Sequence, residues 1–182
     1  MKFFRGLTNK EDLFEGLFQS LEEKFHTPKE IDTGYRPQPK QKILHECKAN
    51  EILYGGAAGP GKSHALRHEG LNWCLRIPGL QVYLFRRTYP ELEKNHILPS
   101  LAEFPRGYGK YRDQKRRWEF PNGSMIHFCH VQHEKDVFQY QGAEIHLLII
   151  DELTSFTEFV YDYLRGRVRC ALEIPEEHQH KA

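Results

Sequence analysis

Apolar positions along the chain repeat with two different spacings, one typical of helices and the other of strands. Near the beginning, leucines and phenylalanines recur every three to four residues after Thr8 and Glu11, which match a capping box at a helix start. Further along, helical spacing and shorter alternating or continuous apolar runs follow one another. We expect helices over 41–47, 62–75, 90–104 and 158–171, and strands over 51–54, 80–86 and 146–150.

The residues around Pro121-Asn122-Gly123 alternate between apolar and polar on both sides, which predicts a β-hairpin. Helices that alternate with strands favour an α/β fold with a mainly parallel sheet flanked by helices. We expect an N-terminal helix and irregular connector over 1–34, followed by one domain over 35–182. The irregular stretch contains three prolines and a glycine between residues 27 and 40.

Composition narrows the class of protein. The chain has 182 residues, with 26 Lys and Arg against 25 Asp and Glu, so it carries no overall basic charge. This balance neither supports nor excludes binding to nucleic acid, because a basic patch can still form locally. The four cysteines are far apart and form no CxxC pair, which favours a reducing compartment. No apolar run is long enough for a membrane span, and we expect a cytoplasmic protein.

The segment from Gly56 to Ser63 matches G-x-x-x-x-G-K-[ST] and lies between a predicted strand and a predicted helix. Such a P-loop wraps phosphates with backbone N–H groups, and small residues keep side chains out of the way. Lys62 should reach the β- and γ-phosphates of ATP, and the Ser63 hydroxyl should bind Mg²⁺. An ordinary flexible turn would explain the small residues but not Lys-Ser. The nucleotide-contacting set is Gly56, Ala57, Ala58, Gly59, Pro60, Gly61, Lys62, Ser63 and His64.

A pair of carboxylates follows the apolar run that ends at Ile150. Ligands in α/β proteins bind at the carboxyl ends of the strands. Asp151 is therefore expected to hold Mg²⁺, and Glu152 to polarise the attacking water. An exposed acidic turn is the alternative, but the upstream P-loop favours a catalytic pair. Gln41, at the start of a predicted helix, is our candidate for the adenine edge, although a solvated helix start explains it nearly as well.

Several segments taken together, in this order, resemble the ATPase domain of the large terminase subunit of tailed bacteriophages. The resemblance covers about residues 35–169 and is carried by "YGGAAGPGKS", "VYLFRRTYPEL", "WEFPNGSMIHF", "YQGAEIHLLIIDELTSF" and "YLRGRVR". It implies a P-loop, RecA-like fold of the additional-strand type and a motor that uses ATP and Mg²⁺ to thread double-stranded DNA into a procapsid. It also implies a small terminase subunit and the portal ring as partners, and assembly into a homo-oligomeric ring in the host cytoplasm.

The sequence departs from the family pattern in two ways. No arginine lies inside the glycine-rich motif, so Arg86, Arg87, Arg167 and Arg169 become candidates for stabilising the transition state, and we select Arg87 and Arg167. The family has a further core strand after the acidic one and a nuclease domain, and this sequence shows neither pattern. We therefore expect no nuclease activity, and a sheet with a gap or an uncovered edge beside the P-loop strand.

Two rival functions stay open: a helicase-like or DNA-repair ATPase, and a nucleotide-binding fragment without turnover.

Two further patterns are weaker. The His and Cys residues of "HFCHVQH" would point to opposite faces of a strand, which argues against a zinc site. The basic run "KYRDQKRRW" could contact a DNA backbone, but most charge runs are solvated faces.

Overall fold

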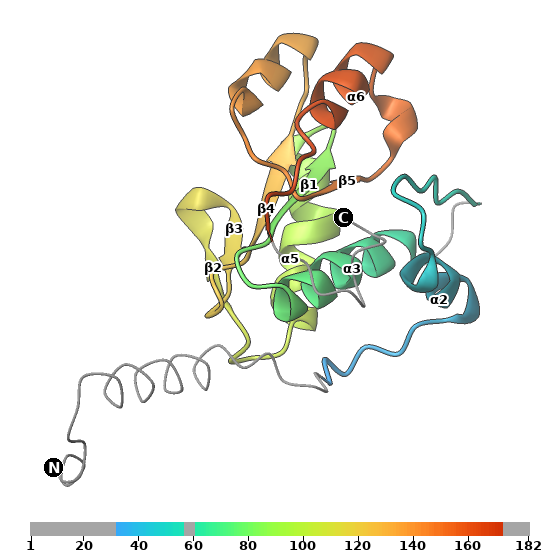
Figure 1. Ribbon diagram of the computed structural model, residues 1–182, viewed down its shortest axis with the longest axis vertical. Coiled ribbons are helices and arrows are strands. Elements are labelled where there is room, and N and C mark those ends of the chain that lie inside the picture. The colour runs from blue at the N-terminus through green and yellow to red at the C-terminus, as the bar shows by residue number, and fades with distance from the viewer. Residues whose placement is uncertain (1–31, 57–60, 173–182) are drawn as a thin grey trace, which may run out of the picture. The chain divides into compact units, whose positions relative to one another are not determined.

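The structure is a computed structural model that describes residues 32–56 and 61–172 (Figure 1). These residues all fall within one compact unit, Ile31–Ala182. The helix expected after Thr8 lies outside the described residues, as do Ala57, Ala58, Gly59 and Pro60 of the glycine-rich motif. No described helix has the length and apolar character needed to cross a membrane.

Helices form close to where the apolar spacing predicts them. They are α2 (Pro39–Glu46), α3 (Lys62–Arg76), α4 (Tyr89–Leu92), the π-helix η1 (Glu93–Ile97), α5 (Leu98–Glu103) and α6 (Glu158–Arg165). Three short 3₁₀ segments are η2 (Asp113–Lys115), η3 (Glu134–Tyr140) and η4 (Leu153–Ser155). The last helix is shorter than expected: α6 ends at Arg165 with Gly166 as its cap, and the chain then pairs with Ile145, just before β5, instead of remaining helical to residue 171.

Five strands form one sheet in the order β2-β3-β4-β1-β5. They are β1 (Gln81–Arg86), β2 (Lys110–Arg112), β3 (Arg117–Glu119), β4 (Met125–His130) and β5 (Leu147–Ile150). Strand β1 is parallel to β4 and β5, whereas the pairs β2–β3 and β3–β4 are antiparallel. The expectation of a mainly parallel sheet is therefore wrong, and the sheet is mixed. The hairpin is confirmed as β3–β4, and its Gly123 has the positive φ of 83° that its turn requires.

The expected strand over 51–54 is also wrong. No strand forms there, and the side chain of Leu53 is 84% exposed. The physical reason is the lack of a neighbour, because an apolar strand is stable only when it is paired and covered. Strand β5 is the last strand at one side of the sheet. Within the described part of the chain, pairing beyond it is limited to an isolated parallel bridge between Ile145, just before β5, and Val168. The β5 edge of the sheet is therefore open among the described residues. The gap expected beside the P-loop strand stays a prediction, because residues 51–54 form no strand, and so does a RecA-like arrangement.

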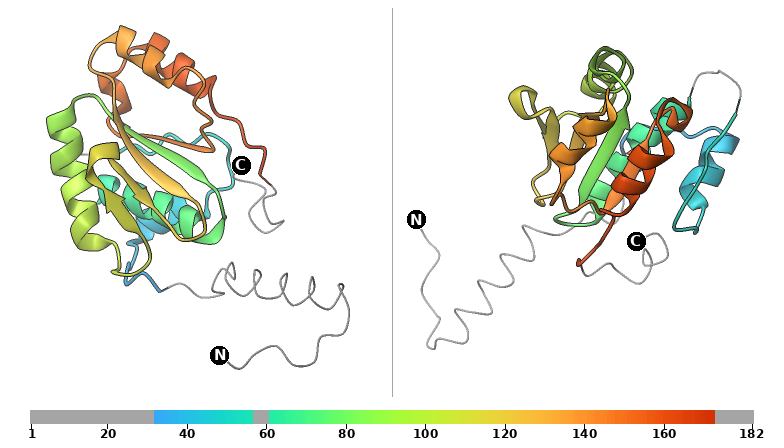
Figure 2. Two further views of the ribbon diagram at one scale, coloured as in Figure 1. Left: turned by 90° about the vertical axis from the view of Figure 1, so that its left-hand side faces the viewer. Right: turned by 90° about the horizontal axis from the view of Figure 1, so that it is seen from above.

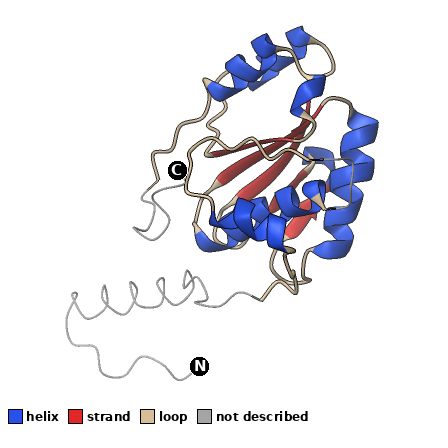
Figure 3. Cartoon of the chain, turned by 90° about the vertical axis from the view of Figure 1, so that its right-hand side faces the viewer, coloured by secondary structure: helices blue, strands red, loops and turns tan. Residues whose placement is uncertain are grey.

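The core lies on both faces of the sheet because successive residues of β1 point to opposite sides. Val82 and Leu84 face α3 and the α4–α5 helices, in a cluster that includes Leu71. Phe85 faces the opposite way, toward η3 and α6. Figures 2 and 3 show the resulting layers, with helices on both sides of the central strands. Helix α3 comes close to the sheet at Gly70, where an added Cβ would lie 3.3 Å from Val82 Cγ1.

The helix that follows β1 widens into a π-turn for an identifiable reason. Pro99 has no N–H, so it cannot donate to the carbonyl of Asn95 four residues earlier. Arg67 of α3 donates to that carbonyl instead, at 2.5 Å, and the N–H of Leu98 bonds to Glu93 five residues back. The wider turn includes His96, which is fully buried. Its ring contacts Asp151, the residue that follows β5. Single π-turns of this kind are frequent at functional sites.

Candidate functional site

One carboxylate oxygen joins four elements at the carboxyl end of the sheet. Asp151 follows β5, and its Oδ2 accepts a hydrogen bond from Ser63 Oγ of α3 at 2.8 Å and one from Arg86 of β1 at 2.7 Å. His96 Nε2 of η1 lies 2.9 Å from the same oxygen. Since a carboxylate only accepts, Nε2 of His96 must carry the proton. The predicted phosphate motif and the predicted acidic pair therefore meet through Ser63 and Asp151.

Asp151 is ionised despite its burial. Burial by itself raises the pKa of this carboxyl, but the hydrogen bonds from His96 and Ser63 and the nearby Arg86 charge outweigh it and lower the pKa to about 2. Burial lowers the pKa of His96, so at neutral pH the ring donates as a neutral imidazole. Arg86 is the permanent positive charge in this group, and only 8% of its surface is exposed.

Glu152 differs from Asp151 in both exposure and backbone. Its side chain is 60% exposed, and Oε1 lies 3.4 Å from Arg86 NH2. Its φ of 57° places it in the left-handed region, which a residue other than glycine rarely adopts. The N–H of Glu152 bonds to Asp151 Oδ1 at 3.1 Å. This turn directs one carboxylate into the sheet end and the other toward solvent. The roles expected for the pair, a metal-binding acid and a water-polarising acid, stay predictions.

The described part of the glycine-rich motif has the geometry of a loop that leads into a helix. Lys62 Nζ donates to the Gly56 carbonyl at 2.9 Å and so reaches back across the segment. Gly61 has a φ of 122°, and an added Cβ would lie 2.8 Å from the side-chain nitrogen of Gln41. Glycine is therefore required at this position. His64 lies on the first turn of α3, beyond Ser63.

Gln41 is buried and bonded at both ends of its amide. Its Nε2 donates to the Gly61 carbonyl at 2.8 Å, and its Oε1 accepts from the Gln38 N–H at 2.8 Å. The side chain thus links α2 to Gly61, the last glycine of the motif. Contact with adenine stays a prediction for Gln41, whereas its packing against the motif is observed.

The candidate arginines occupy different environments. Arg86 contacts both members of the acidic pair. Arg87 is exposed and donates to the Ser155 carbonyl, and the guanidinium of Arg167 lies 4.6 Å from the centre of the Tyr163 ring. The backbone of Arg169 bonds to Ile145. Neither selected arginine, Arg87 nor Arg167, makes a described contact with Asp151 or Glu152, and their roles stay predictions.

The two weaker sequence patterns can now be placed. Within the basic run, Arg112 and Arg117 both pair with Glu119, at 2.9 and 2.6 Å, so part of its charge is neutralised. Trp118 of the same run is buried. In "HFCHVQH", Cys129 points into the core, and no group of ligands suited to a metal forms there among the described residues.

The comparisons with known proteins agree with the resemblance of the sequence. A family model described as "Terminase large subunit, T4likevirus-type, N-terminal" matches residues 53–175. The match covers more than half of the chain, and the chain belongs to this family of large subunits of DNA-packaging bacteriophage terminases. Neither the comparison with curated proteins nor that with solved structures found a match.

Sequence reasoning did not select two residues of the site. Arg86 is one of the four candidate arginines but not one of the two selected, yet its position at the end of a buried strand beside β5 is what brings it to Asp151. His96 gave no signal of its own. The combination of a helical pattern and Pro99 could have indicated a distorted turn at that point, because proline frees the carbonyl four residues before it.

Arg86 is predicted to hold the site together, and its exposed neighbour Arg87 provides a matched control. The Arg86→Met variant leaves the Asp151 charge buried beside a thioether. We expect it to lower the free energy of unfolding by about 3–5 kcal/mol, the usual cost of removing one partner of a buried ion pair. Arg87→Met should change it by less than about 1 kcal/mol. Urea unfolding of both variants measures the difference, and equal losses would contradict the assignment.

Proposed function

We propose that this chain is the ATP-hydrolysing part of a terminase large subunit, which couples hydrolysis of Mg²⁺-ATP to movement of double-stranded DNA into a procapsid. The observation that supports this most is the hydrogen bond of 2.8 Å between Ser63 and Asp151. It brings the end of the glycine-rich motif to the first residue of the acidic pair, although 88 positions separate them in the sequence.

The residues present fit a magnesium-nucleotide complex. Mg²⁺ prefers oxygen ligands, and the serine hydroxyl and the ionised aspartate supply two at one point. The N-terminus of α3 begins at Lys62 and offers backbone N–H groups to an anion. When bound, Mg²⁺ would neutralise charge on the phosphates during transfer.

The proposed roles of the protein residues follow from their positions. Lys62 exchanges its bond to the Gly56 carbonyl for phosphate oxygens. Glu152, exposed and adjacent to Asp151, accepts a proton from the attacking water. Arg86 holds both carboxylates in place, and Arg87 and Arg167 are the candidates that could stabilise developing charge. Gln41 would contact adenine from its place beside Gly61.

The wider setting is proposed from the family. The partners would be double-stranded DNA, a small terminase subunit, the portal ring and further copies of the chain in a ring, all in the host cytoplasm.

A second candidate function is nucleotide binding with little turnover. It is favoured by residues 51–54, which lead into the glycine-rich motif without being paired in the sheet. Phosphate release measured with and without DNA separates this candidate, and a helicase-like ATPase, from a packaging motor.

Lys62 is predicted to be necessary for nucleotide binding. In Lys62→Ala the phosphates lose their fixed counter-charge, so the affinity for a fluorescent ATP analogue should fall at least about tenfold. The matched control is Lys42→Ala, because Lys42 is an exposed lysine of α2. Equal affinity in the wild type and in Lys62→Ala would contradict the assignment of the motif.

Glu152 is predicted to act in hydrolysis and not in binding. Glu152→Gln keeps the size of the side chain but removes its basic oxygen. It should bind ATP normally and hydrolyse it about 10²- to 10⁴-fold more slowly in a single-turnover experiment. The control Glu134→Gln changes an exposed acid of η3 and should behave as the wild type. A wild-type rate in Glu152→Gln would show that another residue activates the water.

A further inference from the structure

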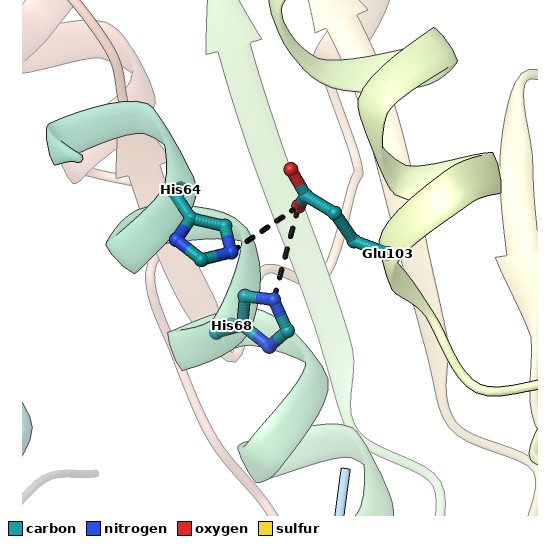
Figure 4. A group of neighbouring side chains, drawn as sticks. All are labelled: His64, His68 and Glu103. Carbon is teal, nitrogen blue, oxygen red and sulfur yellow. Dashed lines mark ion pairs between the residues drawn. The ribbon is translucent and has the colours of Figure 1, made fainter. Parts of the chain in front are cut away.

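Two histidines on α3 face one carboxylate on α5, next to the proposed nucleotide site, whose predicted contacts end at His64. His64 and His68 are four residues apart, so they lie on the same side of the helix. Glu103 ends α5 and points between them (Figure 4). Nε2 of His64 and Nε2 of His68 each lie 3.8 Å from Glu103 Oε2. Among the described residues, this is the group whose ligand atoms converge closely enough for a metal ion, all within 4.8 Å of one another.

Glu103 is held in this position by Arg67, from the same helix as the histidines. Arg67 Nε donates to Oε2 at 2.8 Å, and its NH2 donates to Oε1 at 2.5 Å. Arg67 is itself buried and anchored to the Asn95 carbonyl. A carboxylate oxygen has two lone pairs, so Oε2 keeps one for a further partner. Arg67 therefore orients the carboxylate as outer residues orient the ligands of metal sites.

His68 is fixed in place but makes no hydrogen bond with either ring nitrogen. Its side chain is 2% exposed and stacks on Tyr35, with ring centres 4.0 Å apart and planes 4° from parallel. Nδ1 has no partner, and 3.8 Å from Nε2 to Glu103 is too long for a hydrogen bond. Burial, together with the nearby His64, Arg67 and His45, lowers the pKa of His68 to about 3. Neither ring nitrogen of His68 is therefore used by a hydrogen bond, and a neutral imidazole nitrogen can bind a metal ion.

The spacing fits a tetrahedral ion. Bonds of about 2.0–2.2 Å to nitrogen and oxygen place neighbouring ligands about 3.4 Å apart. The two separations of 3.8 Å from Glu103 would need to shorten by about 0.4 Å, and the ligand nitrogens of His64 and His68, which lie within 4.8 Å of each other, would need to approach as well. His64 is partly exposed and can make this adjustment, whereas His68 and Glu103 are already held.

We propose that His64, His68 and Glu103 form a binding site for a divalent transition-metal ion, Zn²⁺ foremost, with an open fourth position for water. Imidazole nitrogens prefer Zn²⁺, Co²⁺ and Ni²⁺, whereas Mg²⁺ and Ca²⁺ prefer oxygen. The Arg67 guanidinium offsets the carboxylate charge, so the ion is selected by nitrogen coordination and not by net negative charge. The bound ion links α3 to α5, and it would stabilise the fold by mass action.

The test uses the full chain, freed of metal with a chelator and titrated with ZnCl₂ while heat release and thermal unfolding are recorded. We expect one equivalent of Zn²⁺ to bind, to raise the unfolding temperature, and to bind equally well in excess Mg²⁺. His64→Ala should lower the Zn²⁺ affinity at least about tenfold, since even outer residues of a metal site contribute 10- to 100-fold. Glu103→Gln should weaken binding as well, and far-UV circular dichroism checks that both variants are folded.

Controls distinguish this group from other possible ligands. His133→Ala, and a double variant in which His178 and His180 are replaced by alanine, should bind Zn²⁺ as the wild type does. Cobalt substitution gives an independent readout, because a tetrahedral site with nitrogen and oxygen ligands absorbs in the visible range without a thiolate charge-transfer band. Unchanged Zn²⁺ affinity in His64→Ala, a thiolate band, or the absence of Zn²⁺ binding would each overturn the proposal.

Discussion

The arrangement of the site depends on a single buried oxygen, Oδ2 of Asp151. Three donors from three separate elements converge on it: Ser63 from α3, Arg86 from β1 and His96 from η1. A carboxylate in such a place is costly to desolvate and is stable only when its lone pairs are satisfied. Because each donor comes from a different element, the three hydrogen bonds to this oxygen fix the positions of α3, β1 and the π-helix η1 relative to β5.

The pattern of apolar residues predicts the local elements well but not the edges of the sheet. The helix from Lys62 and the strand ending at Arg86 follow from spacing alone, because one buried face is enough to specify each. The segment at 51–54 has the composition of a buried strand yet is not paired. A strand forms there only if a neighbouring strand pairs with it, and local composition does not tell whether one is present. The predicted hairpin supplies the antiparallel pair β3–β4, but no local pattern predicts that β4 also pairs in parallel with β1, which makes the sheet mixed.

The candidate site shows the same division between local and long-range information. Ser63, Asp151 and Glu152 could be predicted because a motif and an apolar run identify them, and the structure brings them together. His96 could not, because its role arises from a helix distortion at Pro99 and from packing against a residue 55 positions away. Gln41 is predicted to contact adenine, yet its amide already bonds to the Gly61 carbonyl and to the N–H of Gln38 at the start of α2. The sequence pattern identifies Gln41 as a residue near the motif, but its hydrogen-bond partners can be known only from the fold.

The central claim is that Ser63 and Asp151, which contact each other at 2.8 Å, together form part of a magnesium-nucleotide site. A crystal structure of the chain with Mg²⁺ and a non-hydrolysable ATP analogue tests this most directly. The account predicts that Ser63 Oγ leaves Asp151 and binds Mg²⁺, and that the phosphates lie against the N-terminus of α3. Asp151 should face the ion and keep its hydrogen bond from Arg86. A nucleotide bound elsewhere, or an unchanged hydrogen bond between Ser63 and Asp151 with nucleotide present, would contradict it.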